Sequence, residues 1–189
     1  MTAQRVAALV DGRALTEDAV EAGVAALRRG PLAARLPRAG TADARNLRRW
    51  VVQVMTYKAV LTNAAAALGL DTEPAGHDSE LTFGDALRMG GVTAAVLASH
   101  PVAPAVRERV VADIVVSESA VRDYYDRNRD LYSCAYDEAH PAIENELRRA
   151  AADRRFTLWL ERRHAESVTL MPGFEHPADP RHADATHRH

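Results

Sequence analysis

The sequence has little of several residues that stabilise small proteins or build common metal sites. Cys134 is the only cysteine among 189 residues, which excludes an intrachain disulfide framework and a zinc site made of several cysteines. Aromatic residues are scarce, with three Phe and two Trp, although 47% of the chain is apolar and much of that is alanine. This composition favours helices that pack through small side chains over a β-sandwich or a β-barrel.

The chain also lacks a strong net charge and long apolar runs. Its formal net charge is −2, and the many arginines alternate with acidic residues, which is typical of solvated helix faces rather than of a nucleic-acid surface. No stretch is long and apolar enough for a transmembrane span. The first apolar run stops at Asp11, too early for the core of a signal peptide. We therefore expect a cytoplasmic protein that binds neither nucleic acid nor membrane, and the sequence leaves a homodimer open.

Two short apolar runs, one near each end, predict strands. Val6–Val10 is followed by the turn residues Asp11 and Gly12, and residues 168–171 are followed by Pro172 and Gly173. An isolated strand is not stable in water. We therefore expect the two runs to pair as a two-stranded antiparallel β-pair that joins the N- and C-terminal segments.

Helical signals fill the region between these runs. Thr16 and Ser117 are good N-cap residues. Apolar residues at three- and four-residue spacings predict a central core helix that opens at Asp43 and ends at Gly69, and Asp137 starts the longest helix. The expected fold class is mainly α, with one helical domain over residues 1–171 and an arm over residues 172–189 packed on it.

The C-terminal arm, residues 172–189, concentrates the side chains that bind metals. It holds four of the eight histidines, interleaved with carboxylates, and its prolines exclude a continuous helix. Imidazole and carboxylate without thiolate suit a divalent transition metal such as iron, copper or zinc. The candidate ligands are His176, His182, Asp184, His187 and His189, with Asp179 and Glu175 as reserves or as partners that orient a ligating imidazole.

The type of metal chemistry stays open at this point. Two histidines and one carboxylate suit non-haem iron and oxygen chemistry, whereas three histidines and a bound water suit zinc-assisted hydrolysis. His187 and His189 are two positions apart, so an extended chain directs both to one side. The competing interpretation is a solvated polar tail, which is common at chain termini.

In residues 6–18, 116–132 and 136–170, the sequence resembles the SurA-like chaperones and parvulin-type peptidyl-prolyl isomerases. Residues 6–18, Val-Ala-Ala-Leu-Val-Asp-Gly-Arg-Ala-Leu-Thr-Glu-Asp, are similar to the opening of these proteins. Residues 116–132 are similar to the helix before their isomerase domain, and residues 136–170 to the helix and final strand after it. The resemblance implies a SurA-like helical core with client-holding helices.

One departure from that family bears directly on activity. Where the family inserts its parvulin domain, this chain has only Ser133, Cys134 and Ala135. No isomerase active site can be carried over, so the resemblance does not imply a peptidyl-prolyl isomerase. The His-rich arm is an addition to the family pattern.

Two functional hypotheses follow from these observations. The first is a cytoplasmic metalloenzyme that acts on a small molecule through the arm. The alternative is a non-catalytic chaperone or interaction module that binds client polypeptides. The remaining candidate residues carry less weight. We interpret Cys134 as an inert thiol and His77 and His100 as loop residues. We expect His140 and His164 to be surface residues of the longest helix.

Overall fold

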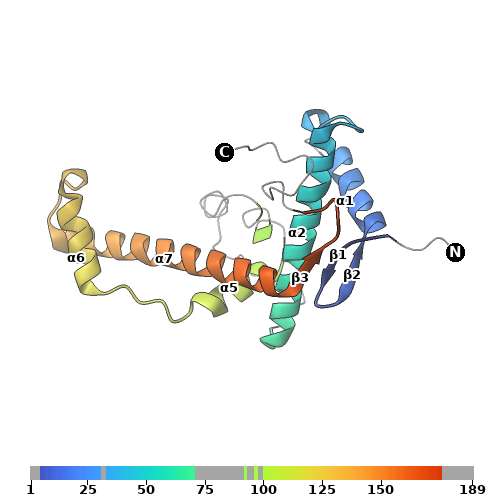
Figure 1. The fold of residues 1–189 in the computed structure, drawn as a ribbon. Helices are drawn as coiled ribbons and strands as arrows, with labels where there is room; N and C mark the ends of the chain where they lie inside the picture. Colours follow the sequence, from blue (N-terminus) through green and yellow to red (C-terminus); the bar gives the residue numbers. More distant parts are fainter. Residues whose placement is uncertain (1–4, 31–32, 71–91, 93–95, 98–99, 176–189) are drawn as a thin grey trace.

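The computed structural model describes residues 5–30, 33–70, 92, 96–97 and 100–175. These residues form a mainly helical fold with one small antiparallel sheet, which confirms the expected fold class (Figure 1). The elements in chain order are β1 (Val6–Val10), β2 (Arg13–Thr16), α1 (Glu17–Arg29), the 3-10 turn η1 (Ala33–Arg35), α2 (Ala42–Ala67), α5 (Ala103–Val111), α6 (Glu118–Arg127), the 3-10 turn η2 (Arg129–Leu131), α7 (Tyr136–Ser167) and β3 (Val168–Leu170). None of the helices in the described ranges is long and apolar enough to cross a membrane.

The sheet joins the two ends of the described chain, in the strand order β2-β1-β3. Strand β1 pairs antiparallel with β3, with Ala8 opposite Leu170, so the predicted pairing of the two apolar runs is confirmed. The expected β-pair was incomplete, however, because the sheet has a third strand. Asp11 and Gly12 have φ values of 48° and 77°, the left-handed backbone of a tight hairpin turn, which folds the chain directly back into β2.

Local capping signals set the starts of several helices. Thr16 accepts a hydrogen bond from the backbone N–H of Ala19 at 3.2 Å, and Ser117 accepts one from Ala120 at 3.2 Å. Both N-caps were predicted from the sequence. The central helix α2 begins at Ala42, one residue before the predicted start, because Thr41 caps it.

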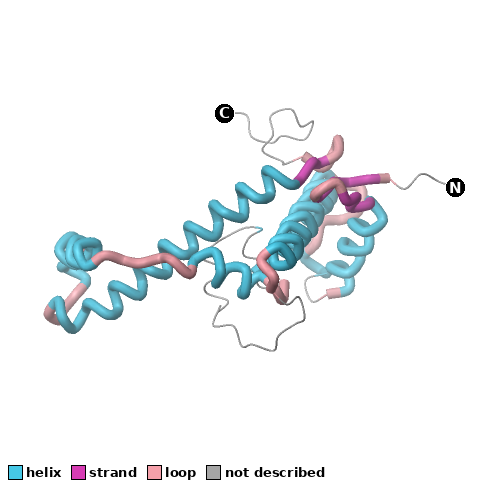
Figure 2. The backbone as a smooth tube through the Cα atoms, turned by 90° about the horizontal axis from the view of Figure 1, so that it is seen from below, coloured by secondary structure: helices cyan, strands magenta, loops and turns pink. Residues whose placement is uncertain are grey.

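Helix α7 belongs to two separate apolar clusters. Phe156 and Leu160, both fully buried, pack with residues of α2 and α5. Near the other end of the helix, Ala139 and Ile143 pack with α6. Residues 148–151, between the two clusters, are exposed. Helix α7 therefore extends from the sheet-containing body to an outlying α6–α7 hairpin, and both views show this extension (Figures 1 and 2).

Candidate functional site

The structure describes only one of the seven residues predicted as metal ligands. The other six lie outside the described residues: His176, Asp179, His182, Asp184, His187 and His189. Glu175 is described, and its Oε2 accepts a hydrogen bond from the backbone N–H of Gly173 at 2.7 Å. Across the described ranges, no group of three or more His, Cys, Asp or Glu side chains could hold a metal ion.

The segment that leads into the arm is firmly attached to the body. Residues 171–175, the C-terminal anchor, continue the sheet, because the N–H of Met171 donates to Ala7 O at 3.0 Å. Phe174 is only 6% exposed and packs in a cluster of small residues from β1, α1 and α2. The other buried members of this cluster are Ala7, Ala8, Val20, Val24, Val51 and Val52. Burying a Phe side chain stabilises a fold by about 1.5–3 kcal/mol, so the start of the arm has a fixed position.

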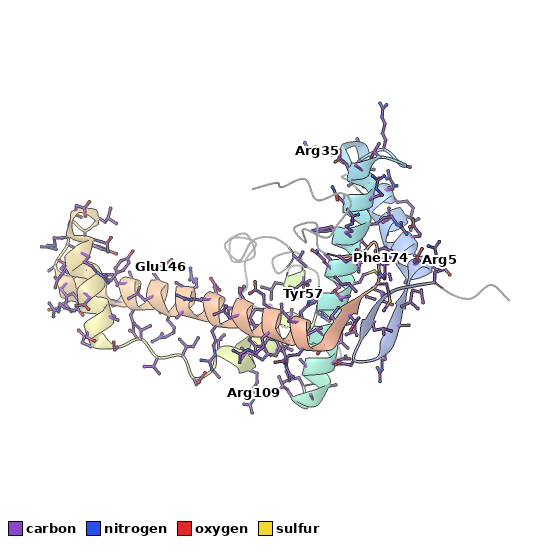
Figure 3. All side chains as sticks on the ribbon, viewed as in Figure 1. Arg5, Arg35, Tyr57, Arg109, Glu146 and Phe174 are labelled. Atoms are coloured by element: carbon purple, nitrogen blue, oxygen red, sulfur yellow. The ribbon has the colours of Figure 1, made fainter. Side chains whose placement is uncertain are left out.

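Two consecutive arginines of α2, Arg48 and Arg49, contact the C-terminal anchor, and Figure 3 labels Phe174 of this anchor. Arg49 is 3% exposed, and its Nε donates to Gly173 O at 3.2 Å while its Nη1 donates to Asn46 Oδ1 at 2.7 Å. A buried guanidinium needs such partners because desolvation of an unpaired charge is costly. The Arg48 guanidinium lies over the Phe174 ring, 5.3 Å from its centroid.

Helix α2 continues this polar contact along its buried face. The buried polar or charged side chains of the described chain are Arg49, Gln53 and Thr56. Their spacing of four and then three residues places them on one side of the helix. We call these three residues the polar stripe. Arg49 contacts the anchor at Gly173, and Thr56 contacts His164 of α7, so the stripe connects the anchor to α7.

His164 is not the surface residue that the sequence predicted. Its Nε2 lies 2.9 Å from Thr56 Oγ1, and that hydroxyl donates its own proton to Gln53 O at 2.9 Å. Because a hydroxyl has one proton, His164 must donate its Nε2–H, which leaves Nδ1 with a free lone pair. The Tyr57 ring stacks on the imidazole at 4.0 Å between centroids. Burial lowers the pKa of His164 to about 4, so the ring is neutral at pH 7.

Glu161 of α7 carries a negative charge that acts on Tyr57. Glu161 precedes His164 by three residues on α7, so both side chains leave the same face of the helix. Burial, and after it the negative charge of Glu161, raise the pKa of the Tyr57 hydroxyl. An imidazole with a free nitrogen and a carboxylate are groups that can accept a proton or bind a metal ion.

Glu161 also belongs to an open hollow along α7, with a volume of about 570 Å³. The hollow extends from Glu146 to Glu161 and includes Arg154 and Asp153. The charge of Asp153 is balanced by Arg107, whose Nη2 lies 2.6 Å from Asp153 Oδ1. This volume is in the range of small-molecule sites.

The other chemistry-bearing residues have structural contacts. His140 Nε2 lies 2.7 Å from Glu118 Oε2, which ties α7 to the start of α6. His100 Nε2 lies 3.2 Å from Thr62 Oγ1. The carbonyl of Cys134 accepts a hydrogen bond from the Tyr125 hydroxyl at 2.8 Å, within the turn of the outlying hairpin. His77 lies outside the described residues.

Sequence reasoning missed His164, although a signal for it was present. Residues 156, 160 and 164 follow at four-residue spacing, and the first two are fully buried. That spacing continues the apolar face of α7 toward α2. It indicates partial burial of position 164, but it does not indicate the partner that orients the ring.

Comparison with known proteins gives one partial match. A family described as "Family of unknown function (DUF7158)" matches residues 6–43, which is 38 of the 189 residues. The matched segment contains β1, β2, α1 and the first residues of α2, including Val20 and Val24 beneath Phe174. No curated protein matches the chain, and no solved structure matches it. The resemblance to SurA-like chaperones therefore stays a prediction.

Proposed function

We propose that the protein binds a divalent transition metal, iron, copper or zinc, through its C-terminal arm. We further propose that the bound ion makes it a cytoplasmic metalloenzyme acting on a small molecule. The proposed ligands are drawn from His176, His182, Asp184, His187 and His189, with Asp179 and Glu175 in reserve. The observation that supports the proposal is the anchor, in which Gly173 O accepts a hydrogen bond from Arg49 of α2 and Phe174 is buried against β1, α1 and α2, directly before Glu175.

The anchor favours a metal site over a solvated tail for an energetic reason. Fixing the backbone of one residue costs about 1–2 kcal/mol, so a metal site formed by a wholly free terminus would carry the full ordering cost of its chain. Phe174 and Arg49 meet part of that cost, because they hold residues 173 and 174 in place. The remaining ligands then need to order a shorter segment.

The donor set fits the proposed ions. Four imidazoles and three carboxylates in residues 175–189, without a thiolate, match the ligands that iron, copper and zinc accept in proteins. When bound, such an ion would supply Lewis acidity and, for iron or copper, redox chemistry. The chain itself offers the hollow along α7 as space for a small molecule, with the Arg154 guanidinium and the Glu161 carboxylate as polar contacts.

The alternative function, client binding without catalysis, is favoured by a different observation. Val115, Leu131 and Leu158 are 85%, 68% and 56% exposed. Val115 and Leu131 flank α6, and Leu158 lies on the part of α7 that packs on the body. Exposed apolar side chains of this kind support contacts with a polypeptide. The client-binding hypothesis predicts that the arm can be deleted without loss of binding to client polypeptides.

Elemental analysis tests the proposal directly. Untagged full-length protein, purified without chelator, is compared with a His187→Ala/His189→Ala double variant and with His140→Gln as a histidine control outside the arm. We expect close to one metal ion per chain in the wild type and in His140→Gln, and a large loss in the double variant. Absence of metal from the wild type, even after incubation with iron, copper and zinc salts, would overturn the proposal.

A further inference from the structure

We propose that a second copy of this chain binds through two surfaces of opposite charge, the basic turn between α1 and α2 and the outlying α6–α7 hairpin. The basic turn comprises residues 28–30 and 33–45. In the resulting dimer, the basic turn of each copy contacts the hairpin of the other copy. The contact needs no metal ion, so it is independent of the proposed function.

Arginines predominate in the basic turn. Residues 28–45 hold five arginines and one acidic residue, Asp43, so the mixture of opposite charges along the whole chain is absent here. Arg29, Arg35 and Arg38 are exposed. None of these three forms an ion pair within the described part of the chain. The turn therefore presents three guanidinium groups to solvent.

The fold fixes the backbone of the basic turn at one end of the body. Valines of α1 and α2 pack in one apolar cluster, and the turn joins these two helices. Arg28 Nη2 donates to Pro37 O at 2.8 Å. Thr41 Oγ1 caps α2 by accepting a hydrogen bond from the N–H of Ala44 at 3.1 Å. A backbone already held in place lowers the ordering cost of binding a partner.

The outlying hairpin carries the opposite charge. Residues 118–147 hold eight acidic residues and three arginines. Asp126, Asp130 and Glu138 are exposed. No ion pair engages any of these three carboxylates among the residues that the structure describes. The hairpin therefore presents unpaired carboxylates on the part of the fold that extends away from the body.

Two arginines of the hairpin lie against aromatic rings rather than beside these carboxylates. The guanidinium of Arg122 is 3.5 Å from the centroid of the Tyr136 ring, and that of Arg129 is 4.6 Å from the centroid of the Tyr125 ring. Both contacts are attractive interactions inside the hairpin. The exposed carboxylates consequently remain available to the cations of another molecule.

The two surfaces do not neutralise each other within one chain. Figure 3 labels Arg35 in the basic turn and Glu146 on the hairpin part of α7, and these residues lie at well-separated ends of the described fold. Exposed charges that are more than about 8 Å apart are largely screened at physiological ionic strength. A second copy in the antiparallel orientation brings a basic turn and a hairpin together.

Two-fold symmetry makes the two contacts of this dimer equivalent. In an isologous interface, each contact between a residue of one copy and a residue of the other recurs across the axis. Both basic turns and both hairpins are then occupied, so no matching surface is left for a third copy. Complementary charges at both ends also exclude the parallel orientation, in which like charges would meet.

Each surface also has an exposed apolar side chain close to its charges. Leu131, which follows Asp130 at the end of the hairpin, is 68% exposed. Trp50, shortly after the basic turn on α2, is 38% exposed. Stable interfaces combine an apolar centre with a polar rim, and Trp and Arg are frequent among the residues that contribute most to binding.

A second copy suits the basic turn better than a nucleic acid does. A long polyanion would be attracted by the turn, but it would be repelled by the hairpin and by the overall net charge of −2. The hairpin of another copy supplies carboxylates without that repulsion. Its own basic turn then engages the hairpin of the first copy, so both charged surfaces are used at once.

Sedimentation velocity of the full-length protein, with chelator present, measures the dimer Kd. The chelator prevents a shared metal ion from joining two copies. Arg35→Glu/Arg38→Glu reverses the charge of the basic turn, and Asp126→Arg/Asp130→Arg reverses that of the hairpin. The two variants are measured separately and as an equimolar mixture.

We expect the wild type to form a dimer whose Kd weakens about tenfold or more between about 0.05 M and about 0.5 M NaCl. Each reversed variant should show a Kd weaker by about tenfold or more, because like charges then meet at both contacts. The equimolar mixture should restore the dimer, because opposite charges meet again at both contacts.

Two further variants control for net charge and for folding. Arg162→Glu/Arg163→Glu changes two exposed residues of α7 outside both surfaces, and its dimer Kd should match the wild type. Should a reversed variant misfold by circular dichroism, neutral substitutions to Gln or Asn at the same positions replace it, and these should also weaken the dimer.

Three results would overturn the inference. The first is a wild type that stays monomeric up to about 1 mM chain. The second is a dimer whose Kd is unchanged in both reversed variants, or a mixture that binds no better than either variant alone. The third is a monomeric wild type that binds a short labelled DNA duplex and loses that binding in Arg35→Glu/Arg38→Glu, which would assign the basic turn to nucleic acid.

Discussion

Thr56 accepts a hydrogen bond from His164 at 2.9 Å and donates its own proton to the carbonyl of Gln53 at 2.9 Å. A residue of α2 thus sets the tautomer of a histidine that comes 108 positions later on α7. The same α2 face holds the C-terminal anchor through Arg49. Helix α2 therefore contacts both the segment that leads into the arm and the imidazole of His164.

The first prediction concerns the pH dependence of stability in the metal-free protein. Burial lowers the pKa of His164 to about 4, whereas an unfolded histidine titrates near pH 6.5. Above pH 6.5 both states are neutral, and the contribution to stability is fully present. As pH falls from about 6.5 to about 4, the unfolded chain binds a proton that the folded chain excludes, so the free energy of unfolding decreases.

Urea unfolding of wild type and His164→Gln, at several pH values between 7.5 and 4.5, measures this effect. The wild type should lose more stability across that window than the variant. Burial, and after it the charge of Lys58, also lower the pKa of His100, so a His100→Gln protein provides the matched reference for a second, half-buried histidine. Equal pH dependence in wild type and His164→Gln would show that the imidazole does not exclude a proton in the folded state.

Phe174→Ala should destabilise the protein by about 3–5 kcal/mol, the usual cost of removing a buried Phe. The side chain is 6% exposed and is the largest among alanines and valines in its cluster. Phe174→Leu should cost much less, since it keeps most of the apolar volume. Val115→Ala, at an 85% exposed position, serves as control and should change the free energy of unfolding by less than about 0.5 kcal/mol.

Arg49→Met should loosen the anchor without unfolding the helices. The change removes the donors to Gly173 O and Asn46 Oδ1, and a hydrogen bond to a charged group contributes about 1.5–3 kcal/mol. Arg49→Lys should not restore the anchor, because one ammonium cannot reproduce the guanidinium geometry. Hydrogen exchange at the Phe174 amide, which donates to Met171 O at 3.0 Å, should accelerate in both variants. Unchanged exchange in Arg49→Met would contradict this role.

The outlying hairpin should unfold separately from the body. Ile143 is 1% exposed in the cluster with α6, and Leu160 is fully buried in the cluster with α2 and α5. The exposed residues 148–151 separate the two clusters. Ile143→Ala, at a cost of about 2–5 kcal/mol, should therefore accelerate hydrogen exchange in α6 and leave α2 protected. Leu160→Ala should accelerate hydrogen exchange in α2 more than in α6. Equal acceleration of exchange in both helices, in either variant, would indicate that hairpin and body unfold as a single cooperative unit.

Several elements followed from the sequence because their causes are local. The N-caps Thr16 and Ser117 act on residues three positions away, and the turn at Asp11 and Gly12 depends on two residues that tolerate left-handed backbone. The pairing of β1 with β3 followed from a simple constraint, since two isolated apolar strands each need a partner. The strand β2 did not follow, because four residues with two exposed side chains carry no apolar alternation.

The histidine-rich composition of residues 176–189 is a property of the sequence alone, and the metal proposal began there. Tertiary structure decided the rest of the candidate site. Burial of Arg49, seating of Phe174 and orientation of His164 all depend on where α7 and β3 cross α2. Residues more than a hundred positions apart meet at that crossing, and sequence periodicity reports only which face of a helix is apolar, not which partner covers it.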